Sequence, residues 1–301
     1  MLHFIQILIH FKRRTLPLLC LICFSGIIQK SFAQPFLDLL HTSYTTNPGR
    51  YFGKSIPGDK SLTYLNVSTT LPILLKNKKD AIVLSPFFEK WATTTLPPFA
   101  KSRHYGAGLP VSLFKSSGSE HWSFVFTLIP RINTDQFNNT DKFQLGGAIQ
   151  VNYKTDSSLT YKFGIYINDD LFGLFVMPLG GIDWRIDRNN SLFGVLPGNL
   201  KYEHRFSNIF YGGGSFRAIT NSYSKGNEYW RIDENEAGLF TDVYFSKNLV
   251  LNLEGGHSIS RRIRTGTSRR NYVDWQMKDD FYIRTGLVVR LRLDRRREGN
   301  N

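Results

Sequence analysis

The stretch Phe281–Asp294 reads FYIRTGLVVRLRLD, and its side chains change character from one residue to the next. One alternate set is mostly apolar and runs from Ile283 through Leu287 to Leu293. The other set carries three arginines, Arg284, Arg290 and Arg292. Successive side chains of a β-strand point to opposite faces. The stretch therefore predicts a strand with one apolar face and one basic face.

The same period-2 alternation recurs along the chain, and short polar turns such as Asp156-Ser157-Ser158 separate the alternating runs. Fourteen runs are predicted as strands, at 37–46, 61–76, 80–92, 104–115, 121–133, 143–155, 158–168, 173–187, 191–197, 199–206, 208–223, 229–246, 248–263 and 281–294. The count falls to twelve if the short run at 191–197 is a bent part of its neighbour. Fourteen strands place the short turns at one end. They place longer connections near 47–60, 93–103, 134–142 and 264–280 at the other.

The first 33 residues have the features of a signal peptide. Lys12, Arg13 and Arg14 precede an apolar run, Leu16–Ile28, that is too short to span a bilayer as a helix. Ser31-Phe32-Ala33 supplies the small residues that a signal peptidase needs, so cleavage is predicted between Ala33 and Gln34. We therefore expect an exported chain in which residues 34–301 form one domain.

Composition excludes several classes of protein. Both cysteines, Cys20 and Cys23, lie in the predicted signal, so residues 34–301 can form no disulfide and no cysteine-ligated metal site. The whole chain has 38 basic and 24 acidic residues, and only four of the bases belong to the first 33. Such an excess of bases can indicate nucleic acid as a partner. Export and the lack of any nucleic-acid motif argue against that partner.

Strand length and aromatic placement favour a membrane barrel over a soluble β-sandwich. A sandwich would alternate in the same way locally. However, many of the predicted strands have about 11 residues or more, the length that crosses a bilayer, against about five or six in ordinary sheets. Residues 34–301 contain no apolar run long enough for a membrane helix, so a protein integral to the membrane must be a closed barrel. Aromatic residues near the ends of apolar faces suit interfacial girdles: Trp122, Tyr153, Tyr161, Trp184, Tyr202 and Phe245.

Three segments carry a resemblance to a known family: Phe175–Trp184 (FVMPLGGIDW), Leu192–Gly198 (LFGVLPG) and Leu200–Glu203 (LKYE). Through them the chain resembles a Bacteroidota-type outer-membrane β-barrel family of unknown function. The resemblance implies a fold and a location, and it carries no catalytic residues.

The final strand has a second resemblance. Arg284, Gly286, Val289 and Leu291 are similar to the C-terminal signal that barrel-assembly machinery recognises. The resemblance implies that this machinery is a partner of the chain. The chain departs from the signal because it runs on through Arg295–Arg297 to Asn301 and does not end on an aromatic residue.

The polar alternate positions would line the lumen of such a barrel. They are Lys154, Lys162, Asp183, Arg185, Lys201, Glu203, Arg205, Glu236, Asp242, Glu254, Arg284, Arg290 and Arg292. Because buried charges must be matched, we expect most of them to form ion pairs. The alternative hypothesis is a water-filled passage for small solutes that prefers anions because unpaired arginines line it.

An outer-membrane lipid-modifying enzyme is a second function class. Its candidate residues would be His257 and Ser258, with His204 and His121 elsewhere. Neighbours on a strand point to opposite faces, so His257 cannot serve Ser258 as a base. No G-x-S-x-G or H-E-x-x-H motif occurs, and the sequence indicates no metal site and no cofactor.

The sequence therefore predicts an all-β chain, a single antiparallel transmembrane β-barrel of about 12–14 strands. We expect it to lie in outer-membrane lipid with its termini in the periplasm and a structural or passive-transport role. A soluble exported β-protein is the competing fold.

Overall fold

The computed structural model describes residues 34–48, 61–77, 79–94, 102–136, 143–267 and 271–294. The predicted signal peptide and the run Arg295–Arg297 lie outside these residues. Within them the regular structure is entirely β, in eighteen strand segments. They are β1 (Phe36–Pro48), β2 (Ser61–Thr69), β3 (Leu71–Leu74), β4 (Ala81–Leu84), β5 (Phe87–Thr94), β6 (Ser102–Gly108), β7 (Val111–Ser116), β8 (Trp122–Thr134), β9 (Phe143–Lys154), β10 (Leu159–Asp170), β11 (Gly173–Arg185), β12 (Asn190–Leu196), β13 (Asn199–Arg205), β14 (Phe210–Lys225), β15 (Glu228–Tyr244), β16 (Leu249–Gly266), β17 (Tyr272–Gln276) and β18 (Phe281–Arg292).

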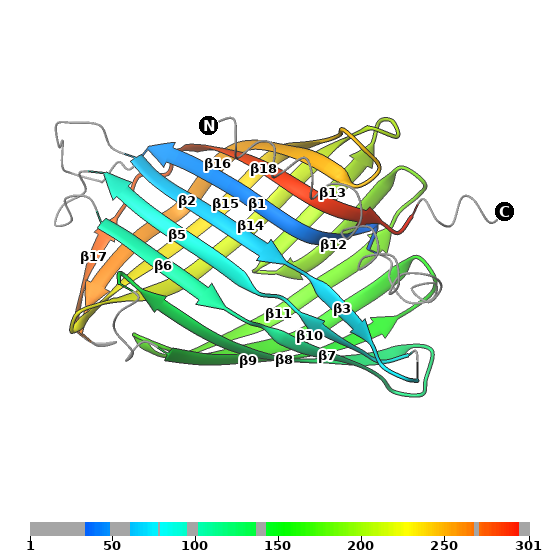
Figure 1. Cartoon of the computed structure of the whole chain (residues 1–301), viewed down its shortest axis with the longest axis horizontal. Helices are drawn as coiled ribbons and strands as arrows, with labels where there is room; N and C mark the ends of the chain where they lie inside the picture. The colour runs from blue at the N-terminus through cyan, green and yellow to red at the C-terminus, as the bar shows by residue number, and fades with distance from the viewer. Residues whose placement is uncertain are drawn as a thin grey trace, which may run out of the picture. The chain divides into compact units, whose positions relative to one another are not determined.

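These segments make one closed antiparallel barrel of fourteen strands (Figure 1). Four strands are interrupted and consist of two segments each: β2 with β3, β4 with β5, β6 with β7, and β17 with β18. The barrel closes where β1 pairs with β18, in a register that runs from Phe36 opposite Arg292 to Thr46 opposite Ile283. β12 and β13 are separate strands joined at Pro197-Gly198. The prediction of fourteen strands is therefore confirmed, and the alternative of twelve is wrong.

The two ends of the barrel differ as predicted. One end, called the turn end below, holds the start of β1, the finish of β18 and the short connections such as 155–158 and 245–248. The other, called the loop end, holds the longer connections. The prediction of one long connection at 264–280 is wrong, because β16 continues to Gly266 and Tyr272–Gln276 pairs with it as β17.

The alternation of the closing strand is confirmed by its exposure. On β18 the outward Phe281 and Ile283 are 71% and 62% exposed, whereas the inward Arg284 and Arg290 are 5% and 1% exposed. Large apolar side chains on the outward faces of the other strands are exposed in the same way, Leu239, Phe163 and Leu128 among them. An apolar belt thus surrounds an interior that holds charged and polar groups together with a buried hydrophobic cluster.

Prolines explain two of the strand interruptions. Pro86 separates β4 from β5, and Pro110 separates β6 from β7. Proline has no N–H to give to a sheet. The wall stays continuous at these two prolines because their carbonyl oxygens accept hydrogen bonds from the backbone of the neighbouring strand. Pro86 O accepts from Thr69 N at 3.0 Å and Pro110 O accepts from Ser85 N at 2.9 Å.

A bulge changes the inward set of β16. The register with β15 shifts between Asp233 and Asn235, and Ser260 opposite this shift has a φ of 53°. One extra residue in a strand reverses which alternate positions face inward. Ser258 is therefore buried before the bulge, and Arg261 and Ile263 are buried after it.

No helix among the described residues is long and apolar enough to cross a membrane.

Candidate functional site: the barrel lumen

The arginines of β18 are ion-paired inside the barrel. Arg284 lies between two carboxylates, with its guanidinium 2.7 Å from Glu254 and in direct contact with Glu236. Glu254 also accepts hydrogen bonds from Ser215 at 2.9 Å and from Tyr282 at 2.6 Å. A buried charge with several charge-assisted hydrogen bonds is well compensated.

Arg290 and Arg292 bind further acids near the turn end. Arg290 bridges Asp38 and Asp242, each at 2.5 Å, and lies 3.6 Å from the ring centre of Phe36. Arg292 is 2.9 Å from Glu203. Because β14, β15 and β16 separate β13 from β18 in the wall, the pair of Arg292 and Glu203 reaches across part of the lumen.

Of the other predicted lumen residues, some lie within their strands and some lie at the strand ends. Lys162 pairs with Asp183 at 2.7 Å, and the Lys201 amine lies 4.9 Å from the ring centre of Phe240. Lys154, Arg185 and Arg205 are the last residues of β9, β11 and β13, so they lie at the turn end.

Several inward charges were not among the predicted lumen residues. They are Asp38, Glu89, Arg131, Asp170, Arg217, Glu234 and Arg261. Arg131 and Arg217 lie on strands that the sequence predicts. Following the alternation of inward and outward side chains along those strands identifies both as inward. Arg261 could not be found in this way, because the bulge at Ser260 reverses the parity that places it opposite Glu234.

The charged side chains of the lumen differ in exposure, and Asp38 at the turn end keeps 27% of its side-chain surface exposed. Glu203, Glu236, Asp242 and Glu254 are all buried. In contrast, the side chains of Lys162 and Arg217 keep 13% and 21% of their surface exposed, although both are ion-paired. Buried carboxylates therefore lie beneath cations that a solute in the lumen could reach.

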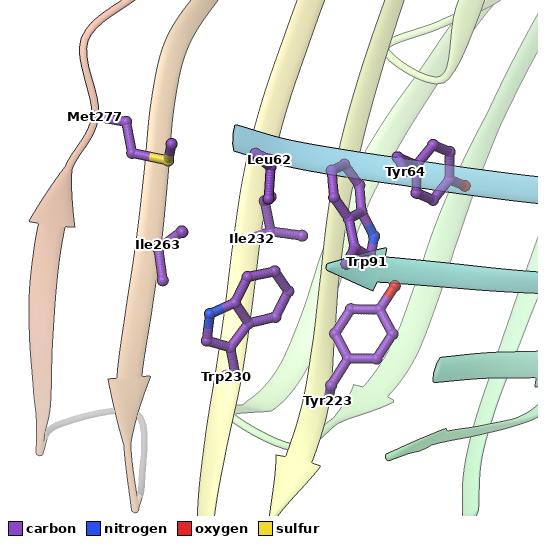
Figure 2. Close-up of a cluster of buried hydrophobic side chains, with 8 residues drawn as sticks. All are labelled: Leu62, Tyr64, Trp91, Tyr223, Trp230, Ile232, Ile263 and Met277. Atoms are coloured by element: carbon purple, nitrogen blue, oxygen red, sulfur yellow. The ribbon is translucent and has the colours of Figure 1, made fainter. Parts of the chain in front are cut away.

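Aromatic side chains from opposite walls meet toward the loop end. His104 of β6 stacks on Trp230 of β15, with ring centres 4.1 Å apart and planes at 6°. Tyr64 and Trp91 lie 4.2 Å apart beside them, and Tyr223 lies 5.6 Å from Trp230. We call these five residues the aromatic plug. Figure 2 shows four of them among the aliphatic side chains Leu62, Ile232, Ile263 and Met277.

Hydrogen bonds reinforce the plug across the barrel. The Glu89 carboxylate of β5 accepts from Tyr223 of β14 at 2.5 Å, from Asn221 of β14 at 2.9 Å and from Tyr64 of β2 at 2.7 Å. The backbone N–H of Asp135 donates to Ser224 O at 2.9 Å, where β8 also meets β14. The two walls are in direct contact here, so side chains cross the lumen toward the loop end.

Toward the turn end, one side of the lumen remains accessible. Ser112, Thr127, Gln150 and Asn152 lie on β7, β8 and β9 and keep part of their surface exposed. Thr127 and Ser112 are hydrogen-bonded at 2.8 Å, and Gln150 donates to Asn152 at 2.6 Å. This part of the lumen is lined by hydroxyl and amide groups.

The candidate enzyme residues are not brought together. The His257 ring packs 5.2 Å from Phe281 on the outward face, whereas Ser258 is buried on the inward side. His204 contacts Asn190, and His121 contacts the backbone of Lys154. Among the described residues no group of three or more histidine, cysteine, aspartate or glutamate side chains could hold a metal ion.

The residues of the candidate assembly signal divide between the two faces of β18. Arg284 and Gly286 are buried on the inward face, and Val289 and Leu291 are half-buried on the outward face. The predicted girdle residues lie near the turn end, where Trp122 and Tyr153 have ring centres 4.7 Å apart and Leu159 lies opposite Trp184.

Comparison with known proteins gives weak structural similarities. No family model matches the chain, and no curated protein matches it. The NanC porin is 7% identical, with 84% of this chain and 100% of that chain covered and a TM-score of 0.42. An outer membrane channel from Pseudomonas putida F1 is 8% identical, with 89% and 99% covered and a TM-score of 0.43. A mutant of the TodX monoaromatic hydrocarbon channel is 9% identical, with 84% and 90% covered and a TM-score of 0.38. The resemblance to a Bacteroidota-type family stays a prediction.

Proposed function

We propose that this chain is an outer-membrane β-barrel that lets small solutes pass passively through its lumen. The observation that carries the proposal is a closed barrel with an exposed apolar belt outside and accessible polar and basic groups inside. A bilayer accepts a β-structure only when every strand edge is paired or covered. Export and signal cleavage between Ala33 and Gln34 belong to the same proposal.

The competing soluble fold fits the outward surface poorly. Soluble monomers rarely expose an apolar patch larger than a few hundred Å². Here exposed large apolar side chains occur on strands around the barrel, from Leu145 and Ile165 to Leu239 and Ile283. Cell fractionation and gel migration separate the two folds. We expect the chain in the outer membrane fraction, with migration that changes on boiling. A periplasmic protein without that change would contradict the proposal.

The accessible cations favour anionic solutes. Lys162, Lys201 and Arg217 lie within the lumen, where four of the acids are buried and Asp38 is partly exposed. Conductance of the purified protein in planar bilayers tests this preference, and we expect anions to carry more current than cations. Clear cation preference would contradict the anionic preference. Absence of any channel would leave a structural role as the function.

The final strand supports assembly by the barrel-assembly machinery. Val289 and Leu291 present their side chains outward on the strand that closes the barrel. Alanine at both positions should slow assembly in cells, while unassisted refolding in detergent proceeds. Equal slowing in both assays would indicate a structural role alone. Among the residues that the structure describes, His257 and Ser258 lie on opposite faces, which does not favour the lipid-modifying enzyme.

A further inference from the structure

A groove lies on the outward face of the wall, across the paired strands β7, β8, β9 and β10. It has a volume of about 510 Å³ and is lined by eleven residues. The side chains that alternate with its lining on these strands, such as Gln150 and Lys162, face the lumen. The groove therefore opens to the outside of the barrel. Its rims are exposed apolar side chains: Phe126 and Leu128 of β8, Ile149 of β9, and Ile165 and Ile167 of β10.

The groove has Gly147 as its floor. The strand registers place Gly147 between Leu128 and Ile167 in one row of outward positions. A Cβ added at Gly147 would meet only one atom within 4 Å, the backbone oxygen of Thr127 at 3.3 Å. The larger neighbours therefore stand around a space that the glycine leaves open.

The groove lies near the middle of the apolar belt. The outward positions of β9 run from Phe143 at the loop end to Tyr153, which forms the ring pair with Trp122 at the turn end. These ten residue steps, at about 3.4 Å each and a tilt of about 40°, span about 26 Å. That height matches the apolar band of about 25 Å in outer-membrane barrels. Gly147 is four steps from Phe143 and six from Tyr153, so a bilayer presents only hydrocarbon at its level.

The lining of the groove selects an uncharged hydrocarbon. Thr127 is the one polar side chain among the lining residues, and its hydroxyl is hydrogen-bonded to Ser112 at 2.8 Å on the lumen face. Lipid chains are as apolar as the groove, so attraction between them comes from close packing and not from the hydrophobic effect. A glycine floor favours such packing, because small residues let a neighbour approach the backbone closely.

The size of the groove fits one hydrocarbon chain better than a second copy of the protein. Stable protein interfaces use about 20–30 residues a side, whereas eleven line the groove. Its volume of about 510 Å³ instead falls within the range of about 300–1,000 Å³ that small-molecule sites occupy.

We propose that this groove binds one acyl chain of a phospholipid as an ordered ligand. The end of the chain would pack on Gly147 between Leu128 and Ile167. The headgroup would lie at the level of Trp122 and Tyr153, since aromatic rings with a polar edge sit at the headgroup level of a bilayer. The inference rests on the proposed outer-membrane barrel and adds a lipid site to it.

Photolabelling tests the proposal. The full exported chain is purified in phosphatidylcholine nanodiscs that contain a small fraction of phosphatidylcholine with a diazirine at the end of one chain. After illumination we expect adducts on the lining residues of β8, β9 and β10. Gly147→Leu fills the groove and should lower this labelling about tenfold, the effect of one methylene too many in an apolar pocket.

Gly180→Leu is the matched control. Gly180 of β11 is also an exposed outward glycine, and an added Cβ there meets no atom within 4 Å. It does not line the groove, so its variant should leave the labelling unchanged.

Native mass spectrometry after transfer to detergent gives a second readout. We expect one phosphatidylcholine retained per chain in the unmodified protein and in the Gly180 variant, and none in the Gly147 variant. Equal retention by both variants, or adducts spread evenly over outward strands such as β5 and β15, would overturn the proposal. A dimer that Gly147→Leu dissociates would also overturn it, because a second copy would then cover the groove. If Gly147→Leu does not fold, the positions of the adducts in the unmodified chain decide.

Conductance on the same samples separates this inference from the proposed function. Channels together with evenly spread labelling would reject the lipid site and keep the passive-transport barrel. Labelling confined to the groove without channels would reject free passage of small solutes and keep the lipid site. A chain recovered from the periplasm would reject both.

Discussion

At the scale of single residues, the strongest constraint is the buried cation Arg284 between Glu236 and Glu254. Removing one partner of a buried ion pair leaves an uncompensated charge and typically costs about 3–5 kcal/mol. Arg284→Leu removes the ion pair of Glu254 and leaves Glu236 paired with Arg217 alone. We therefore expect it to lower the free energy of unfolding by at least about 3 kcal/mol, as measured by urea unfolding in lipid vesicles.

Arg262→Leu is the matched control for this prediction. Arg262 is 43% exposed and lies 3.8 Å from Asp274 on the outward face. An exposed ion pair contributes about 0–1 kcal/mol. Equal losses for the Arg284 and Arg262 variants would contradict the role assigned to the buried cation.

Asp80 gives a prediction about pH. It lies in the turn between β3 and β4, 2.5 Å from the Lys115 amine. Hydrogen bonds from Lys115 and Ser116 lower the pKa of its carboxyl from 3.8 to about 2. A folded-state pKa below the unfolded value stabilises the fold above the unfolded pKa, and this contribution is lost as the pH falls through the folded value. Asp80→Asn should therefore destabilise the barrel at neutral pH. The difference from the unmodified chain should shrink as the pH falls from 4 to 2. A difference independent of pH would contradict this account.

At the scale of elements, the bulge of β16 has the clearest consequence. Deleting Ser260 should be tolerated, because regular alternation from Ser258 then keeps Arg261 and Ile263 on the inward face and Arg261 opposite Glu234. Ser260→Pro, in contrast, cannot adopt the φ of 53°, because proline fixes φ at about −65°. We expect Ser260→Pro to lower the free energy of unfolding by about 1–3 kcal/mol, as measured by urea unfolding in lipid vesicles. Ser260→Gly keeps the bulge, because glycine adopts a positive φ readily, and should be tolerated. Equal stability of the proline and glycine variants would contradict the assigned bulge.

The strands differ in how far the sequence predicts them. Period-2 runs bounded by turns such as Pro197-Gly198 predict β12 and β13 as separate strands, and both exist. The same pattern cannot reveal that Ser260 is an extra residue, because a bulge is set by its partner strand. β17 was missed for a related reason. Tyr272–Gln276 is short, and it becomes a strand through pairing with the extended end of β16.

At the scale of the whole molecule, the aromatic plug is the place where side chains from opposite walls meet inside the lumen. Trp230→Ala removes the ring that stacks on His104 from the opposite wall. We expect conductance in planar bilayers to rise several-fold, together with a loss of about 3–5 kcal/mol in the free energy of unfolding. Trp122→Ala, at an outward position near the turn end, should leave conductance unchanged. Unchanged conductance in both variants would show that the plug does not limit flow.

The sequence could predict which side chains face the lumen, and it could not predict which of them meet across it. Parity places Arg292 and Glu203 inside, but their 2.9 Å contact depends on three intervening strands and on the tilt of the wall. The contact between opposite walls toward the loop end has the same origin. Trp230 and His104 belong to strands far apart in the sequence, and neither strand alone indicates the other.

The pairing of β1 with β18 has a consequence for the order of folding. Phe36 lies opposite Arg292, so the first and last strands of the wall must find each other across nearly the whole described chain. Contacts of such high contact order form slowly, and unpaired edges invite aggregation in the meantime. Until β18 emerges, every partial sheet has two open edges. We therefore expect a chaperone-bound, unfolded intermediate to be the species that reaches the membrane, with wall closure as the last and slowest event.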